Sequence, residues 1–145
     1  LTMADLIPGS NYVIPPSARV GTEVAGETIS PGDFTCLPTD SQDGRHHLTD
    51  ATVPANTNKL DILGFATSYA EAGDTYSYVI VEQGTVIDLD TATTQAQEYV
   101  LSKDTPGRLQ PRSDLVSTSL LVVAGQGKGS NELRFAPDNT GIVVP

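Results

Sequence analysis

The sequence of 145 residues has no tryptophan, one methionine and one cysteine, and aromatic residues make up only 6% of it. A single cysteine cannot form a disulfide within the chain. A chain of this length buries roughly 68–70% of its unfolded surface, so one packed core is sufficient without a structural metal. Cys36 lies in an apolar segment without basic neighbours. We therefore expect it to be a buried, unreactive thiol.

Positive charge is also scarce. Eight lysine and arginine residues stand against 18 aspartate and glutamate residues, which gives a net charge of −10 and a pI of about 4.3. The phosphate backbone of nucleic acid and an anionic membrane would both repel such a surface. No stretch has the roughly 18 continuous apolar residues of a membrane span, and the first residues lack the layout of a signal peptide. We expect neither nucleic acid nor a membrane as a partner.

Threonine, valine and isoleucine are abundant, with 37 residues in total, while 13 glycines and 10 prolines are spread along the chain. This composition favours short strands joined by tight turns. We predict an all-β fold, a compact β-barrel or sandwich built from two related units of short strands. Residues 25–145 are expected to form a single β-rich domain and residues 1–24 an extended N-terminal arm.

The prediction of two related units comes from an approximate internal repeat with an offset of roughly 60 residues. In each half, short strand-like segments follow one another in the same order. The first half contains these segments at residues 33–37, 45–48, 63–67 and 76–81, and the second half contains them at 98–102, 107–110, 120–124 and 131–135.

Three local patterns within or between these segments lead to further predictions. Gly64 lies inside an apolar strand, which indicates a bulge or a close backbone approach. Residues 125–130 are rich in glycine and predict a hairpin loop between strands at 119–124 and 132–135. Residues 90–97 contain capping and helix-tolerant side chains, so a single helical turn is one possibility there.

The N-terminal arm has more apolar surface than a solvated tail would have. Its prolines impose an extended backbone and remove hydrogen-bond donors that a central strand needs. We predict that the arm either packs on its own domain or lies across a neighbouring subunit or larger partner, partly by strand addition. The residues expected to make these contacts are Leu6, Ile7, Tyr12, Val13, Ile14 and Pro15.

Residue patterns typical of catalysis or metal binding are missing. His46 and His47 are adjacent, so on a strand their rings point to opposite faces and cannot bind one ion together. No serine lies in a G-x-S-x-G elbow, and nothing selects a catalytic pair among the acidic residues. The glycines at 125–130 lack the spacing of a phosphate-binding loop. We predict no enzymatic activity, no metal and no cofactor.

Several short motifs of the sequence resemble those of tailed-bacteriophage head decoration proteins, also called capsid cement proteins. In that family a run of the form A-G-x-x-I-x-x-G-D opens the body, and an l-G-v-A strand precedes an A-x-x-G-D turn. The matching phrases are Ala25-Gly26-Glu27-Thr28-Ile29-Ser30-Pro31-Gly32-Asp33-Phe34, Leu63-Gly64-Phe65-Ala66, Ala70-Glu71-Ala72-Gly73-Asp74, Gly84-Thr85-Val86 and Tyr99-Val100-Leu101.

This resemblance, which covers roughly residues 25–135, implies a structural virion protein on the outer surface of the capsid. It implies a homotrimer at three-fold or quasi-three-fold positions that clamps neighbouring copies of the major capsid protein, with no catalysis. The acidity of the chain fits an external position, because a protein that meets packaged DNA would usually be basic.

Two other functions remain as alternatives. The first is a phage fibre or receptor-binding module that recognises cell-surface saccharide through Tyr76, Tyr78 and residues 125–130, because alternating tyrosines on a strand can stack on sugar. The second is a small-molecule enzyme, for which a ligand would change the titration of His46 or His47.

Overall fold

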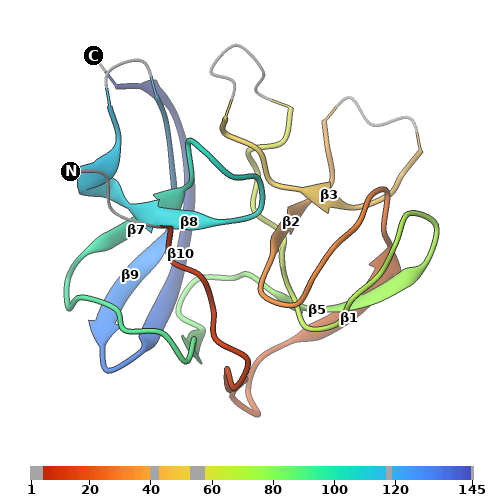
Figure 1. Cartoon of the computed structure of the whole chain (residues 1–145), viewed down its shortest axis with the longest axis horizontal. Coiled ribbons are helices and arrows are strands. Elements are labelled where there is room, and N and C mark those ends of the chain that lie inside the picture. Colours follow the sequence, from red (N-terminus) through yellow and green to blue (C-terminus); the bar gives the residue numbers. More distant parts are fainter. Residues whose placement is uncertain (1–4, 40–42, 53–57, 117–118, 145) are drawn as a thin grey trace.

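The computed structural model describes residues 5–39, 43–52, 58–116 and 119–144. In this part the chain forms ten β-strands, one short 3-10 turn at Arg112–Asp114 and no α-helix (Figure 1). The strands of the first half are β1 (Val20–Val24), β2 (Phe34–Cys36), β3 (His47–Leu48), β4 (Gly64–Ala66) and β5 (Thr75–Ile80). Those of the second half are β6 (Val86–Asp88), β7 (Glu98–Leu101), β8 (Leu109–Pro111), β9 (Leu120–Gly129) and β10 (Glu132–Val143).

Each half of the chain forms its own five-stranded antiparallel sheet. The strand orders are β1-β5-β4-β2-β3 and β6-β10-β9-β7-β8. When the strands of the second half are counted from one, their order is also 1-5-4-2-3. The internal repeat predicted from the sequence is therefore present in the topology, and the predicted all-β class is confirmed: one of the two sheets is curled into a half-barrel.

The two sheets share one hydrophobic core. Phe34 and Phe65 from the first sheet meet Phe135 from the second in edge-to-face contacts, with ring centroids 5.2 Å apart for Phe34–Phe65 and 6.0 Å apart for Phe34–Phe135. All three rings are at most 1% exposed. Such aromatic pairs contribute roughly 0.5–1.5 kcal/mol beyond the area that they bury. The same core contains Leu60, Val79, Val81, Ile87, Leu89, Tyr99, Leu101, Leu109, Leu120, Val122 and Leu133.

One type of tight turn starts half of the strands. In each turn of four residues, the carbonyl of the first residue accepts a hydrogen bond from the N–H of the fourth, and the third residue has a positive φ. A strand begins at the residue that follows the turn. A positive φ at this position is typical of a type II turn and favours glycine. The turns occupy residues 30–33, 71–74, 82–85, 94–97 and 105–108. The turn at 94–97, with Ala96 at φ 66°, takes the place of the helical turn considered for residues 90–97.

The hairpin predicted at the glycine-rich segment is present between β9 and β10, but the predicted extent of its loop was wrong, because residues 125–129 belong to β9. β9 continues through residues 120–129, and Ser130 and Asn131, with φ 49° and 71°, form the tip of the β9–β10 hairpin. Gly125 and Gly127 serve close packing instead. An added Cβ at Gly127 would lie 2.3 Å from the carbonyl oxygen of Thr94. At Gly64 an added Cβ would lie 2.8 Å from Thr35 Oγ1, so the close approach there is made by a side chain and not by another backbone or a bulge.

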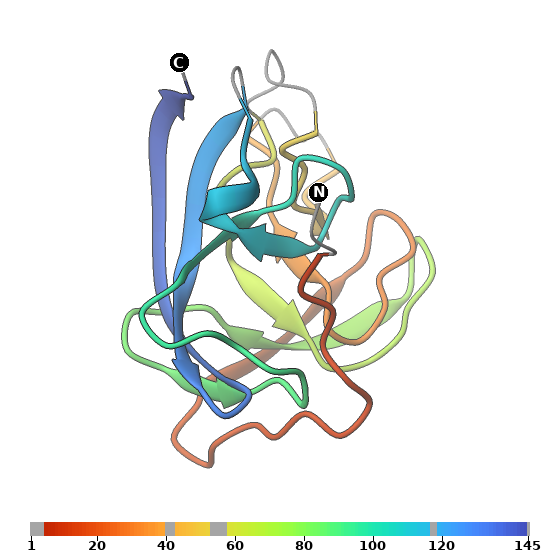
Figure 2. The same cartoon turned by 60° about the vertical axis from the view of Figure 1, so that its left-hand side comes forward.

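The arm ends earlier than we expected. Residues 20–24, placed in the arm from the sequence, form β1 and pair in continuous register with β5. Residues 5–19 make only isolated bridges to strands. Figure 2 shows this part of the chain, in red, running along the outside of the body before it turns into β1.

Candidate functional site

The arm is fixed by main-chain hydrogen bonds to both edges of the second sheet. On the β8 edge, the N–H of Leu6 donates to the carbonyl of Leu109 at 2.7 Å. On the β6 edge, Val13 and Asp88 exchange two hydrogen bonds of 2.8 and 3.2 Å. Exposed sheet edges offer unpaired groups to other chains. The arm therefore covers part of both edges of this sheet with the protein's own backbone.

The arm passes so close to Asp90 that residue 9 has to be a glycine. An added Cβ at Gly9 would lie 2.4 Å from the Asp90 carboxylate and 2.6 Å from its carbonyl oxygen. The N–H of Gly9 donates to the carbonyl of Leu89 at 2.8 Å, and Thr91 Oγ1 donates to the carbonyl of Ile7 at 2.6 Å. Only a residue without a side chain fits at this crossing.

The predicted contact residues of the arm divide into two sets. Leu6 is buried in the shared core, and Tyr12 and Ile14 pack against it. Ile7 and Val13 point outward and are 54% and 58% exposed. Tyr12 also packs edge-to-face on Phe65 and donates its hydroxyl to the carbonyl of Thr67. Leu6, Tyr12 and Ile14 thus bind the protein's own domain, whereas Ile7 and Val13 are available to a partner. Pro15, the last residue of the predicted set, is half-buried.

A buried polar cluster lies on the face of the first sheet that points away from the shared core. The hydroxyl of Tyr76 is 2.6 Å from Nδ1 of His46 and 2.8 Å from Oγ1 of Thr35. The ring of Tyr78 stacks on Tyr76 with centroids 5.3 Å apart. His46 is 4% exposed and Tyr76 1% exposed. Burial lowers the pKa of His46 and raises the pKa of Tyr76, so both groups are held neutral near pH 7.

Burial of His46 predicts a pH-dependent stability. Its pKa in the folded protein is below the ordinary value of 6.5 because of burial and, to a smaller extent, the charge of His47, although Glu23 acts in the opposite direction. As the pH falls below this ordinary value, the unfolded chain binds a proton that the folded chain does not bind. The free energy of unfolding is therefore expected to decrease from about pH 7.5 to about pH 5.5.

Urea unfolding across this range measures the effect, and the His46→Gln variant is the control, because it keeps a hydrogen-bonding side chain but removes the titration. The variant should show a smaller decrease than the wild-type protein. Equal decreases in both proteins would contradict the role of His46. The range stops at about pH 5.5 because burial also raises the pKa of Asp33 above 3.8, which has the opposite effect on stability at lower pH.

The other residues considered for chemistry occupy structural positions. His47 points away from His46, and its two ring nitrogens lie 3.2 Å from Glu27 and 3.3 Å from Asp43. Cys36 is fully buried, and burial raises the pKa of its thiol to about 12. Within the described ranges, no cluster of three or more potential metal ligands is present, and no helix is long and apolar enough to cross a membrane.

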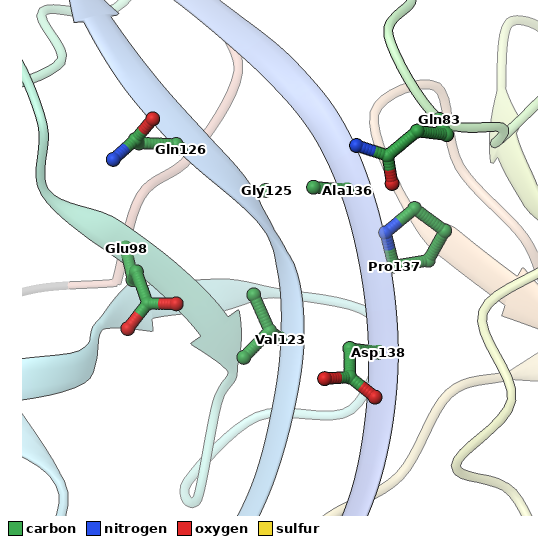
Figure 3. Close-up of a pocket in the computed structure, with 8 residues that line it drawn as sticks. All are labelled: Gln83, Glu98, Val123, Gly125, Gln126, Ala136, Pro137 and Asp138. Atoms are coloured by element: carbon green, nitrogen blue, oxygen red, sulfur yellow. The ribbon is translucent and has the colours of Figure 1, made fainter.

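A shallow depression of about 450 Å³ lies on the outer face of the second sheet (Figure 3). Its floor is formed by small or apolar residues of β9 and β10, among them Val123, Gly125 and Pro137. Glu98 from β7 and Asp138 from β10 lie on opposite sides of Val123. The carboxylate of Glu98 is paired with Arg112. The polar groups of the described lining are the side-chain amides of Gln83 and Gln126 and the two carboxylates, all of which can take part in hydrogen bonds.

Comparison of this chain with protein-family models, with curated proteins and with solved structures found no match. Function is therefore inferred from the residues and the geometry of the chain itself.

Proposed function

We propose that this chain is a structural virion protein that binds the outside of a tailed-phage head and stabilises the lattice of the major capsid protein. The observation that carries the proposal is the arm. It is an extended segment held on the body by hydrogen bonds to β6 and β8, and it presents Ile7 and Val13 to the outside. The resemblance of residues 25–135 to head decoration proteins supports the same function.

The proposed contacts need only modest energy per copy. Full burial of a valine or isoleucine side chain contributes about 1.5–3 kcal/mol, and Ile7 and Val13 are about half exposed. The two side chains together can therefore contribute about 2 kcal/mol to binding. We propose a homotrimer at three-fold or quasi-three-fold positions, where linked contacts act through effective concentration. The net charge of −10 fits the outer surface of the capsid and not its DNA-filled interior.

The saccharide-binding alternative has less support. Tyr76 is 1% exposed and bonded to His46 and Thr35, so its ring cannot stack on a sugar. Residues 125–129, expected to form a recognition loop, belong to β9. Tyr78 is then the only residue of the proposed tyrosine pair with partial exposure. The capsid function needs neither residue.

Binding to phage heads tests the proposal. Heads of the phage that encodes this chain, prepared without it, are mixed with the purified protein and sedimented. We expect the wild-type protein to sediment with the heads. The Ile7→Ser/Val13→Ser double variant should bind about 30-fold more weakly, in line with a loss of about 2 kcal/mol.

The matched control is Val116→Ser, which replaces a side chain of similar exposure, 56%, that lies outside the arm. It should bind as the wild-type protein does. If the wild-type protein does not bind heads but binds a cell-surface saccharide, the capsid proposal is wrong and the fibre alternative gains support.

A further inference from the structure

β1 is an edge strand with unused backbone groups. In an antiparallel pair, alternate residues direct their N–H and C=O groups toward the partner strand. The carbonyl of Arg19 accepts the N–H of Ile80, and Ala25 exchanges hydrogen bonds with Asp74 and Gly73 on the same side. Val20, Thr22 and Val24 must therefore direct their backbone groups away from β5. The carbonyl of Val24 confirms this direction, because it accepts the N–H of His46.

Four groups on this side are free within the described part of the chain: the N–H and C=O groups of Val20 and of Thr22. We call these four groups the β1 edge. The equivalent strand of the second sheet, β6, is covered there by the arm through the Val13–Asp88 hydrogen bonds. No described segment covers β1 in this way; the strand contains no proline and no register shift, and Val20 is 68% exposed. A regular edge with unpaired N–H and C=O groups is a template for pairing with another strand.

We propose that the β1 edge pairs with the β1 edge of a second copy of this chain, antiparallel and across a two-fold axis at Gly21. In this register Val20 lies opposite Thr22 of the second copy, and each pair exchanges two hydrogen bonds. All four free groups of each chain are then used. The contact is isologous, as in most protein dimers.

Neighbouring registers are less favourable because they need groups that are already bonded. A pairing centred on Thr22 would place Val20 opposite Val24, whose carbonyl is occupied by His46. A pairing centred on Val20 would place Thr22 opposite Ala18, whose N–H already donates to Pro15. The register centred on Gly21 is thus the one that uses only free groups.

Charge also fits this register. It places Arg19 of each copy opposite Glu23 of the other, in positions where cross-strand side chains are closest. Glycine at the axis leaves space for the Tyr78 ring, which lies 3.0 Å from where a Cβ of Gly21 would be. Within a single chain, Arg19 pairs at the surface with Glu82, 3.3 Å away. The β1 edge is therefore self-complementary in hydrogen bonding and charge.

Sedimentation velocity of the full chain at increasing concentration tests the pairing. The contact is short, so a weak and reversible association is expected. The decisive variant is Thr22→Pro, which removes an outward N–H and obstructs the edge but leaves the bonds between β1 and β5 in place. At high concentration the wild-type species should have twice the mass of the Thr22→Pro species, which is a single chain of 15.2 kDa where the protein trimerises only on the capsid and a trimer where it trimerises in solution. Thr22→Val keeps the N–H and should associate as the wild-type protein does.

Charge exchange tests the register itself. Arg19→Glu and Glu23→Arg each place like charges opposite one another at two symmetric positions, and each should weaken association about tenfold. The double variant Arg19→Glu/Glu23→Arg restores opposite charges and should associate nearly as the wild-type protein does. The proposal is overturned if the wild-type and Thr22→Pro proteins have the same mass at every concentration, or if the double variant does not recover. Neither result depends on capsid binding.

Discussion

Replacing Gly125 with alanine is expected to lower the free energy of unfolding by about 3 kcal/mol or more. An added Cβ at this position would lie 2.2 Å from the carbonyl oxygen of Arg134 and 3.2 Å from the Cα of Phe135. Both atoms belong to the backbone of β10, so no side-chain rotation can relieve the overlap. β10 would have to move away from β9, and Phe135 would then lose its contact with Phe34 in the shared core.

Chemical denaturation of Gly125→Ala, compared with Gln126→Ala, measures this effect. Gln126 is the next residue on the same strand and is exposed, so its replacement should change stability by no more than about 0.5 kcal/mol. A loss below about 1 kcal/mol for Gly125→Ala would mean that the two strands can separate locally at little cost, and that the glycine is not needed for their packing.

The glycine-rich segment illustrates what the sequence could not predict. Glycine is common both in loops and where two backbones approach closely. The sequence shows the glycines at 125 and 127 but not the carbonyls of Arg134 and Thr94 that press against them, because those contacts form only when strands from other parts of the chain meet. We therefore placed a loop where β9 continues.

The duplicated fold, by contrast, was predictable from local patterns. Alternating apolar residues and glycine-containing turns are properties of short segments, and their order is visible along the chain. The segments at 33–37 and 98–102, for example, contain β2 and β7, which occupy the same place in the two strand orders. Neither the pairing order nor the curl of one sheet followed from these patterns, since both depend on long-range hydrogen bonds.

The arm falls between these cases. Its extended conformation followed from its prolines, and the apolar side chains indicated a surface to cover. The division between Leu6, which is buried, and Ile7, which is exposed, is decided by how the backbone crosses β8. The buried pair of His46 and Tyr76 was missed for a similar reason, because the two residues are brought together by strands that are distant in the sequence.

Deleting residues 1–16 is expected to unfold the protein. The deletion removes Leu6 from the core, and loss of a buried leucine alone costs about 2–5 kcal/mol. It also removes Tyr12 and Ile14, which pack against the core, and it uncovers the edges of β6 and β8. The combined loss of more than about 5 kcal/mol is comparable to the total stability of a typical domain.

Circular dichroism and thermal unfolding of the truncated chain measure this loss, and the Ile7→Ser/Val13→Ser variant is the control. It changes only two half-exposed side chains of the same segment, so its loss of stability should be no more than about 2 kcal/mol, well below that of the truncated chain. A truncated chain that melts as cooperatively as the wild-type protein would mean that the contacts of Leu6, Tyr12 and Ile14 contribute little, and that the whole arm is free to bind a partner. If the truncated chain unfolds, failure to bind capsids reports lost structure, and only the double variant isolates the contribution of the exposed arm residues.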